Sequence, residues 1–341
     1  MKTKFQQTIL AAALVGVVAF TSTIARAQDP LPSWNDGAAK KSINDFVVKT
    51  TTAGSPDFVP PEERIATFDM YGTLLVEKPL PAQAEYCFAR VFVLAQEKPE
   101  LKNTEPFKTI LSGDQAAIAK LSEKDLLKIV AATLTGITVE QFQAQVKEWV
   151  GTGKDPRWKQ PFTHLAYQPM LEVLKYLRAN GFKTYICTGS GQDFVRVFAE
   201  QTFGVPPEQV IGSMGGTSFG YDKDGKPILT KEPKLMLNDD KDAKPQGIHL
   251  MIGRRPHAAF GNSDGDRQML EYTKAGDGAR LAMILLHDDA AREYAYGPAQ
   301  GLPATKMGYF TQALYDEAQK DGWTVISMKN DWKQIFPFEN K

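Results

Sequence analysis

The sequence predicts a three-layer α/β/α fold in which helices cover both faces of a mainly parallel sheet. Two observations support this prediction. Short runs of branched and aromatic residues, typical of strands, alternate with amphipathic helical segments over most of the chain. The alternation stops between Pro79 and Pro161, where apolar residues recur at helical spacing without strand patterns. Repeated strand–helix units favour a parallel sheet, so we expect an α/β core interrupted by an all-helical insertion.

Length and composition are consistent with this organisation. The chain has 341 residues, which is long for one compact domain and favours a core plus a second small unit. Its apolar content of 43% and charged content of 23% are ordinary for a globular protein. The formal net charge at pH 7 is zero, so the charge balance gives no sign of a nucleic-acid or anionic-membrane partner. The oligomeric state stays open.

The first 27 residues have the pattern of a signal peptide. Lys2 and Lys4 give a basic start, Ile9 to Phe20 form an apolar run, and a small-x-small site ends at Ala27. A run of about 12 apolar residues is too short to cross the ~30 Å of a bilayer core. We therefore expect residues 1–27 to be removed, and the mature protein to be periplasmic or secreted with no membrane partner.

The two cysteines, Cys87 and Cys187, both lie in apolar segments. We expect two unpaired buried thiols, because free cysteine behaves as a small apolar residue. An exported protein can also form a disulfide, and the sequence does not decide between the two.

The first elements are justified by local patterns. Residues 34–52 predict a short amphipathic helix, and residues 63–70, "ERIATFDM", predict a strand that ends before Gly72. Three helices are predicted inside the insertion, over residues 84–96, 122–134 and 138–150. The last two begin at N-cap residues, Ser122 and Thr138, each followed three places later by a partner for a capping box.

After the insertion the alternation resumes. A β-hairpin is predicted to turn at Asp224 and Gly225. The remaining predicted elements are helices over 168–180, 193–203, 245–253 and 266–275, strands over 183–188, 209–214, 257–261 and 280–287, and a final helix and strand within 315–328.

Polar residues follow the predicted strands. Asp69 closes the first strand, Thr188 closes the second, and Asn262, Asp264 and Asp266 follow residues 257–261. In open parallel sheets, reactive groups gather at the carboxyl ends of the strands. A carboxylate, a hydroxyl and an acidic cluster, with Lys244 at a helix start, are the groups needed for phosphoryl transfer through an aspartyl intermediate.

Four segments resemble, in the same order, the four motifs of the haloacid dehalogenase superfamily. They are "FDMYGTL" from Phe68, "ICTGSG" from Ile186, "KPQGI" from Lys244 and "FGNSDGDRQML" from Phe260. The similarity is greatest to an exported branch that resembles phosphoserine phosphatases. The resemblance implies a Rossmann-like core over residues 28–78 and 162–341, a helical cap over 79–161 that closes over the substrate, and a hydrolase of small phosphorylated substrates.

The resemblance also implies residue roles. Asp69 is the expected nucleophile, Thr188 the hydrogen-bond donor to the transferred group, and Lys244 the positive charge beside the adduct. The expected substrate-binding residues are Thr73, Gly189 and Ser190. A catalytic Mg²⁺ is expected to be held by oxygens of Asp69, the Tyr71 backbone, Asn262, Asp264 and Asp266, which suits a hard cation. Asn262 stands where related phosphatases commonly have a charged Asp, so the other acids would have to compensate.

Tyr71 departs from the phosphatase pattern. Related phosphatases carry an Asp two residues after the nucleophile, and such an acid–base group contributes roughly 10²–10⁴-fold. Tyrosine, with an ordinary pKa near 10, is a poor base at neutral pH. Leaving groups that depart as stable anions would still react. The 2-haloacid dehalogenases of this superfamily carry the same "D-x-YGTL" spelling and use no metal.

Three functions remain open on the sequence. The "NSDGD" cluster, and Thr188-Gly189-Ser190 where the dehalogenases have Ser-Asn, favour a Mg²⁺-dependent phosphatase with an aspartyl-phosphate intermediate. The alternatives are a 2-haloacid dehalogenase-type hydrolase that forms an ester at Asp69, and a catalytically degraded relative that only binds. The identity of the substrate is not predicted.

Overall fold

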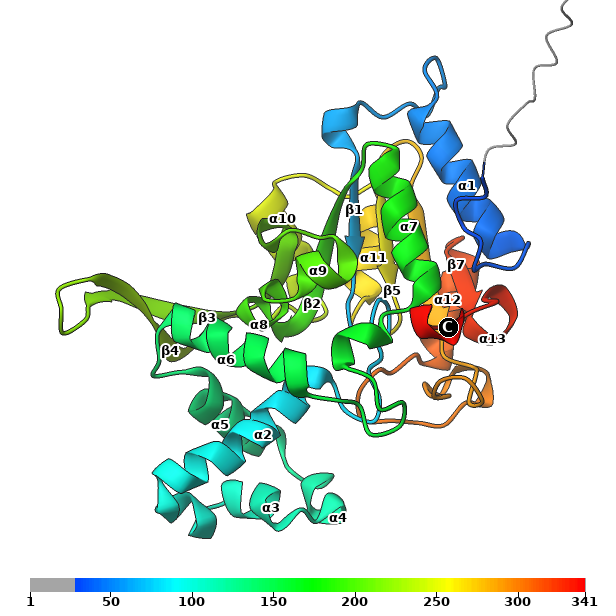
Figure 1. The fold of residues 1–341 in the computed structure, drawn as a ribbon. Helices are drawn as coiled ribbons and strands as arrows, with labels where there is room; N and C mark the ends of the chain where they lie inside the picture. The colour runs from blue at the N-terminus through cyan, green and yellow to red at the C-terminus, as the bar shows by residue number, and fades with distance from the viewer. Residues whose placement is uncertain (1–27, 341) are drawn as a thin grey trace, which may run out of the picture.

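The computed structural model describes residues 28–340 and contains one seven-stranded sheet with the order β4-β3-β2-β1-β5-β6-β7. All neighbouring strands are parallel except β3 and β4, which are antiparallel. This confirms the predicted α/β class (Figure 1). The strands are β1 (Ile65–Phe68), β2 (Lys183–Gly191), β3 (Val210–Tyr221), β4 (Pro227–Leu237), β5 (Ala258–Gly261), β6 (Leu281–Leu286) and β7 (Thr324–Ser327).

The central strands explain where the site lies. β1 and β5 are buried along their whole length, as expected for parallel strands covered on both faces. Their register places Phe68 opposite Phe260, and the two rings stack with centroids 4.4 Å apart. The strand order reverses between β1 and β5, so Asp69 and Asn262 leave neighbouring strands at the switch point where α/β proteins bind ligands.

Helices cover both faces of the sheet. α1 and α7 contribute to one apolar cluster together with Phe68 and Phe260, whereas α10, α11 and α12 contribute to a second cluster that contains Ala259. Residues 259 and 260 of one strand therefore point into opposite layers, as the two-residue period of a strand requires. The core helices are α1 (Ala38–Thr51), α7 (Gln168–Ala179), α8 (Gln192–Arg196), α9 (Ala199–Phe203), α10 (Ala243–Ile252), α11 (Arg267–Lys274), α12 (Gln312–Lys320) and α13 (Met328–Asp331).

One predicted core helix was wrong in extent. Residues 193–203 form two short helices, α8 and α9, because Phe198 leaves the helical region at φ −125°. The break directs the Phe198 ring toward Phe194 and Phe203, whose ring centroids lie 5.6 and 6.3 Å away. Burial of Phe198 accounts for the interruption, and a periodic apolar pattern does not reveal it.

The insertion between β1 and β2 is helical, as predicted, and its helices α2 to α5 form a lobe beside the core (Figure 1). Both capping boxes are present, at Ser122 and Thr138. Two very short helices, α3 and α4, were not predicted, because so few residues show no clear period. The boundaries of the cap at residues 79 and 161 stay a prediction. The helices are α2 (Ala82–Glu97), α3 (Phe107–Ser112), α4 (Gln115–Ile118), α5 (Glu123–Leu134) and α6 (Val139–Thr152).

The hairpin of β3 and β4 is longer than predicted and extends away from the core (Figure 1). Its turn contains Gly225 at φ +78°, a conformation that favours glycine. Lys231 in β4 is hydrogen bonded through its backbone to Gly136 and Ile137, at 2.8 and 2.9 Å. The hairpin therefore holds the loop between α5 and α6, and it joins the insertion to the core.

Two other sequence predictions concern location and thiols. Cys87 and Cys187 are both free and buried, as expected. Within residues 28–340 no helix has the length and apolar character needed to span a bilayer. The predicted signal peptide, residues 1–27, lies outside the described residues. The remaining short elements are 3-10 turns at Pro61–Glu63, Pro99–Asn103, Phe162–Leu165, Pro207–Gln209, Ala299–Gly301 and Pro337–Asn340.

Candidate active site

A cavity of about 630 Å³ lies at the carboxyl edge of the sheet, next to the β1–β5 switch point. Residues of all four sequence motifs line it. They are Asp69 and Tyr71 after β1, Thr188, Gly189 and Ser190 in β2, Lys244 in α10, and Asp264 and Asp266 after β5. The parallel register thus brings together residues that lie up to two hundred positions apart, as predicted from the strand ends.

Lys244 connects the motifs. Its Nζ donates hydrogen bonds to Asp69 Oδ1 and Asp266 Oδ1, both at 2.6 Å, and to the carbonyl oxygen of Cys187 at 2.9 Å. The side chain is only 2% exposed. Burial alone lowers the pKa of Lys244, but the charges of Asp266 and Asp69 outweigh this effect and raise the pKa well above its ordinary value. Lys244 is therefore a permanent buried cation.

Asp69 shares this cation with a second acid. Burial and the charge of Asp266 together raise the pKa of Asp69 to about 8, although Lys244 acts in the opposite direction. One ammonium group cannot fully neutralise two buried carboxylates at equal distances. An additional positive charge near Asp69 would complete the balance.

Asp266 and Asp264 are engaged by neighbouring groups. Asp266 Oδ2 accepts from the backbone N–H groups of Asn262 and Ser263, at 2.9 and 3.1 Å, while Oδ1 contacts Lys244. The Asp264 carboxylate accepts from the backbone and hydroxyl of Thr311, which is the N-cap of α12. Metal ligation by these two acids stays a prediction; in this structure their carboxylates order the loop and anchor α12.

Asn262 lies against the Asp69 loop. Its side-chain amide has two orientations, which exchange oxygen and nitrogen at the same position. With the oxygen inward, Oδ1 accepts from Thr73 Oγ1 at 3.1 Å and lies 3.1 Å from the Tyr71 carbonyl oxygen and 3.3 Å from Asp69 Oδ2. With the nitrogen inward, Nδ2 donates to all three of these oxygens. The nitrogen-inward orientation therefore satisfies all three oxygens, whereas the oxygen-inward orientation would need a cation beside it.

This position fits the Mg²⁺ that the family resemblance implies. With the Asn262 oxygen inward, it lies 3.1 Å from the Tyr71 carbonyl oxygen and 3.3 Å from Asp69 Oδ2, and a cation beside them would remove the repulsion. Two ligands at right angles around Mg²⁺, at about 2.1 Å each, are separated by about 3 Å. The oxygens of Asp69, the Tyr71 backbone and Asn262 are the ones that would hold the ion.

Gly72 makes this arrangement possible. Its φ is +81°, and a Cβ at this position would overlap the Asn262 amide. The Gly72 carbonyl oxygen also accepts from His287 Nε2 at 2.7 Å, and His287 Nδ1 lies 3.0 Å from Glu293 Oε2. His287 is buried behind the loop, where it fixes the Gly72 peptide.

The Tyr71 hydroxyl does not point at the position of a leaving group. It accepts a hydrogen bond of 3.0 Å from the backbone N–H of Gln83, in the first turn of α2. The Gln83 side chain accepts in turn from the Gly191 backbone at 2.8 Å. Burial raises the pKa of Tyr71 well above its ordinary value, so the phenol stays protonated. Tyr71 thus ties the nucleophile loop to the insertion and to the end of β2.

The second motif forms a compact loop beside Asp69. Thr188 is buried, and its Oγ1 accepts from the backbone N–H of Ser190 at 3.2 Å. Because the Thr188 oxygen only accepts in that contact, its own hydroxyl hydrogen is free to point into the cavity. Thr73 was predicted to bind substrate, but it is absent from the cavity wall and lies behind Asn262 as a hydrogen-bond partner.

Glu77 is a cavity residue that the sequence did not indicate. It is buried, and its Oε2 makes no hydrogen bond, although Lys78 Nζ lies 3.5 Å away. Burial raises the pKa of Glu77, with Lys78 and His287 acting in the opposite direction. Its negative charge also raises the pKa of Asp69. No spacing rule links Glu77 to the four motifs, so only the fold reveals that it faces the site.

Asp239 is a second acid that the sequence did not indicate. It lies under the site, fully buried, and its carboxylate accepts from Cys187 Sγ at 3.3 Å. Burial raises the pKa of Asp239 to about 6, and the charge of Lys244 opposes this rise. The surrounding "DDKDAK" segment has the composition of a solvated loop, which is why the sequence did not suggest a buried acid there.

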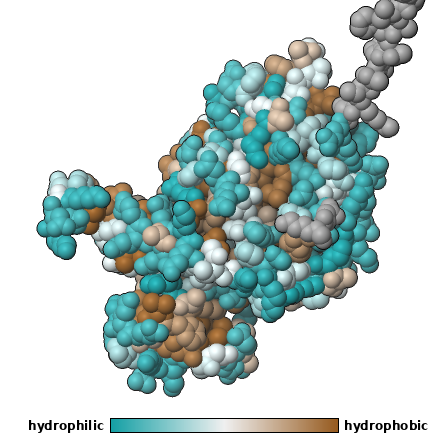
Figure 2. All heavy atoms as spheres, in the orientation of Figure 1, coloured by the Kyte–Doolittle hydropathy of each residue, from teal (hydrophilic) through white to brown (hydrophobic). Residues whose placement is uncertain are grey.

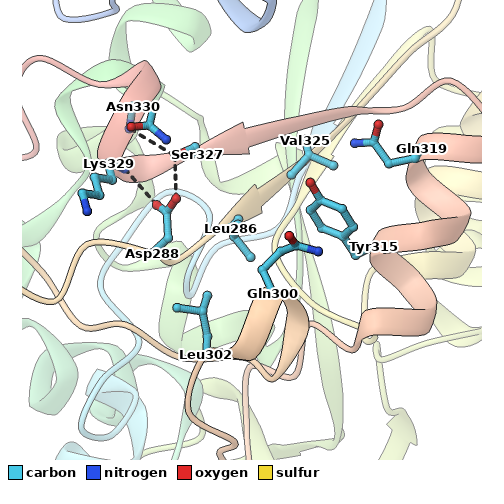
Figure 3. A pocket seen from close by; sticks show the side chains of 10 residues that line it. All are labelled: Leu286, Asp288, Gln300, Leu302, Tyr315, Gln319, Val325, Ser327, Lys329 and Asn330. Carbon is cyan, nitrogen blue, oxygen red and sulfur yellow. Dashed lines mark hydrogen bonds between the residues drawn. The ribbon is translucent and has the colours of Figure 1, made fainter.

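A separate cavity of about 480 Å³ lies near the ends of β6 and β7 (Figure 3). None of the predicted site residues lines it. Its acid, Asp288, accepts from Ser327 Oγ at 2.6 Å and from the Lys329 backbone at 2.9 Å. These bonds hold α13 against the sheet, so this cavity offers structural contacts and no reactive group.

The model of the haloacid dehalogenase-like hydrolase family matches residues 66–271, which is more than half of the chain. The chain therefore belongs to this family, as its four motifs predicted, and it is an enzyme of the hydrolase class. The matched range begins in β1 and ends in α11, so it contains every residue that contacts Lys244. Among curated proteins, no relative matches the sequence.

Solved structures show a distant likeness. A conserved functionally unknown protein from Anaerococcus prevotii DSM 20548 is 17% identical, with a TM-score of 0.49, covering 74% of this chain and 86% of that chain. A phosphoserine phosphohydrolase-like protein from Francisella tularensis subsp. tularensis SCHU S4 is 17% identical, with a TM-score of 0.37. The match covers 66% of this chain and 88% of that chain. Phosphoserine phosphatase from T. onnurineus is 18% identical, with a TM-score of 0.31. The match covers 69% of this chain and 88% of that chain. At such low identities and TM-scores, nothing about this chain's substrate follows.

The contact between Gly72 and Asn262 generates a stability prediction. Gly72→Ala and Gly54→Ala both place a Cβ at a left-handed φ, +81° and +82° respectively, but no atom lies within 4 Å of the Cβ at Gly54. Each variant should lose about 1–2 kcal/mol from backbone strain. Gly72→Ala should lose about 1–3 kcal/mol more, because it displaces the Asn262 amide. Urea unfolding measures both values, and equal losses would show that the amide is free to move.

Proposed function

We propose that the chain is an exported Mg²⁺-dependent phosphohydrolase that acts on small phosphomonoesters through an aspartyl-phosphate at Asp69. The observation that carries this proposal is the pair of buried carboxylates, Asp69 and Asp266, that line the cavity and share the single cation of Lys244. An excess of carboxylate oxygens suits a hard cation, which phosphoryl transfer uses and halide displacement does not. Export is supported by the pattern of residues 1–27.

The first step uses groups that already converge. An Asp69 carboxylate oxygen forms a bond to phosphorus as the bond from phosphorus to the leaving oxygen breaks, and the leaving group departs with the electron pair. Lys244 neutralises charge at Asp69 and stays protonated throughout. The Thr188 hydroxyl would donate to a phosphoryl oxygen, and Gly189 and Ser190 line the cavity beside it. A bound Mg²⁺ would supply further charge neutralisation at the transferred group.

Tyr71 is a weaker acid for the leaving oxygen than the aspartate of related phosphatases. Its hydroxyl accepts from the Gln83 N–H, and burial raises the pKa of the phenol well above its ordinary value. Esters whose alcohol departs as a stable anion avoid this problem. We therefore assign a preference for phosphate esters with good leaving groups.

The second step needs a base, and we assign this role to Glu77. Water attacks phosphorus, the bond to Asp69 breaks with return of its electron pair to the carboxylate, and the water proton passes to Glu77. Glu77 lines the same cavity as Asp69 and has an oxygen free of hydrogen bonds, and burial raises its pKa, which makes the carboxylate a stronger base.

A second candidate function is 2-haloacid hydrolysis through an ester at Asp69. The nitrogen-inward orientation of Asn262 favours it, because the amide then satisfies Asp69 Oδ2 and the Tyr71 carbonyl oxygen without a cation. The "D-x-YGTL" spelling agrees with this alternative. A binding-only role is the third possibility, and it predicts no turnover on either substrate class.

The two chemistries are separated by one experiment. The mature protein should release p-nitrophenol from p-nitrophenyl phosphate with Mg²⁺, lose this activity with EDTA and regain it when Mg²⁺ is added back. Asp69→Asn should lower the rate at least ~10³-fold, because the nucleophile is lost while the side-chain volume is kept. Chloride release from 2-chloropropionate that persists in EDTA would instead establish the dehalogenase.

Replacing Tyr71 should restore the missing acid. Tyr71→Asp is expected to raise turnover of an alkyl phosphate, glycerol 2-phosphate, by roughly 10²-fold relative to the wild type. Tyr71→Phe serves as the control, because it removes only the hydroxyl that contacts Gln83. It should leave the rate on p-nitrophenyl phosphate within about threefold. A drop of ~10²-fold in Tyr71→Phe would mean that the phenol itself transfers the proton.

The role of Glu77 is tested by pre-steady-state kinetics. Glu77→Gln should keep the initial burst of p-nitrophenolate and slow the steady state by roughly 10²–10⁴-fold, since only the second step needs the base. Glu85→Gln is the matched control, because burial also raises the pKa of Glu85 but this residue does not line the cavity. Loss of the burst together with the steady state would place Glu77 in the first step instead.

A further inference from the structure

A second large cavity adjoins the catalytic one. It has a volume of about 610 Å³ and is lined by residues of α5, of the end of β2 with the adjoining helix α8, and of the β3–β4 hairpin. Gly189 and Asn238 line both cavities, so the two meet at the loop that follows Thr188. Volumes in this range are typical of sites for small organic ligands.

The walls of this second cavity are mainly apolar. Its floor contains the rings of Phe142 and Phe194, both buried. Its walls include Leu127, Val130 and Leu235, which are 54%, 37% and 55% exposed. Figure 2 shows further apolar surface on the lobe that holds α2 to α5. Exposed aliphatic side chains gathered around a concave surface indicate a binding site rather than scattered surface residues.

The cavity is held open by polar contacts at its edges. Lys231 forms an ion pair with Asp193, and its Nζ lies 4.7 Å from the centre of the Phe142 ring. The backbone of Lys231 pairs with the loop between α5 and α6. Gln83, which contacts the Tyr71 hydroxyl, also lines the cavity. The same contacts that position the nucleophile loop therefore shape this second cavity.

We propose that this cavity binds the aromatic ring of the leaving group, so that the substrates are aryl phosphomonoesters. The inference rests on the proposed phosphohydrolase function and names its substrate class. Two independent observations agree on it. The apolar cavity with an aromatic floor begins beside the phosphoryl-binding loop, and aromatic rings pack favourably against such rings. The site also lacks an acid at Tyr71, and phenols, with a pKa near ~10, leave as anions far more readily than alkanols.

The kinetic experiment compares 1-naphthyl phosphate with glycerol 2-phosphate, using the mature protein with Mg²⁺. The wild type should prefer the aryl ester at least 100-fold in kcat/KM. Leu127→Gln and Leu235→Gln should each reduce this preference about tenfold, because they place a polar amide on the apolar wall. Both leucines are largely exposed, so the fold should tolerate these changes. Leu126→Gln is the control: it lies on the same helix and is 40% exposed, but it does not line the cavity. It should leave the preference unchanged.

A binding experiment separates this inference from the proposed function. The fluorescence of 1-naphthol should change saturably on addition of the protein, whether or not any ester is hydrolysed. Leu127→Gln should weaken binding about tenfold, and Leu126→Gln should not. Binding of naphthol without hydrolysis of any phosphate ester would support the aryl site and reject the phosphohydrolase. The aryl site would be overturned if both esters were hydrolysed with equal efficiency. It would also be overturned if naphthol binding did not saturate, or if Leu127→Gln and Leu126→Gln weakened that binding equally.

Discussion

The buried ammonium of Lys244 is the contact on which the site depends. An isolated charge in the interior is strongly unfavourable, and it is tolerated here because two carboxylates and one carbonyl oxygen surround it. Asp69 comes from the end of β1, Asp266 from the loop after β5 and Cys187 from β2. One side chain from α10 therefore fixes three strand ends relative to one another. Loss of the ammonium would leave two buried carboxylates facing each other without a counter-ion.

The geometry around Asp69 follows from this constraint. Because Asp266 is oriented by Lys244, its other oxygen holds the Asn262 and Ser263 backbone, and this places the Asn262 amide against Gly72. The amide then meets Asp69 and the Tyr71 carbonyl oxygen at the position that a cation would take. With its nitrogen inward the amide satisfies both oxygens, and under the proposed metal-dependent chemistry its oxygen would face the ion instead.

Much of the fold and the centre of the site could be predicted, because both depend on local patterns and on strand ends. Asp69, Thr188 and Lys244 each sit at a position where a parallel sheet brings its carboxyl ends together, so their convergence needs no tertiary detail. The directions of the Asp264 and Asp266 carboxylates could not be predicted, since the turn after β5 and the N-cap Thr311 decide them. Glu77 and the second cavity were also not predicted. Glu77 lies outside the four motifs, and the cavity is formed by segments that share no motif.

Tyr71 shows how one substitution can alter chemistry and architecture together. An aspartate at this position would be too short to reach the start of α2, whereas the tyrosine spans that distance and accepts from the Gln83 N–H. Gln83 in turn holds Gly191 and lines the apolar cavity, so the loss of an acid coincides with a firmer link between the nucleophile loop and the insertion. Under the proposed function, a weak acid at Tyr71 and an apolar wall beside Gly189 favour the same substrates, because aryl groups both pack against the wall and leave as anions.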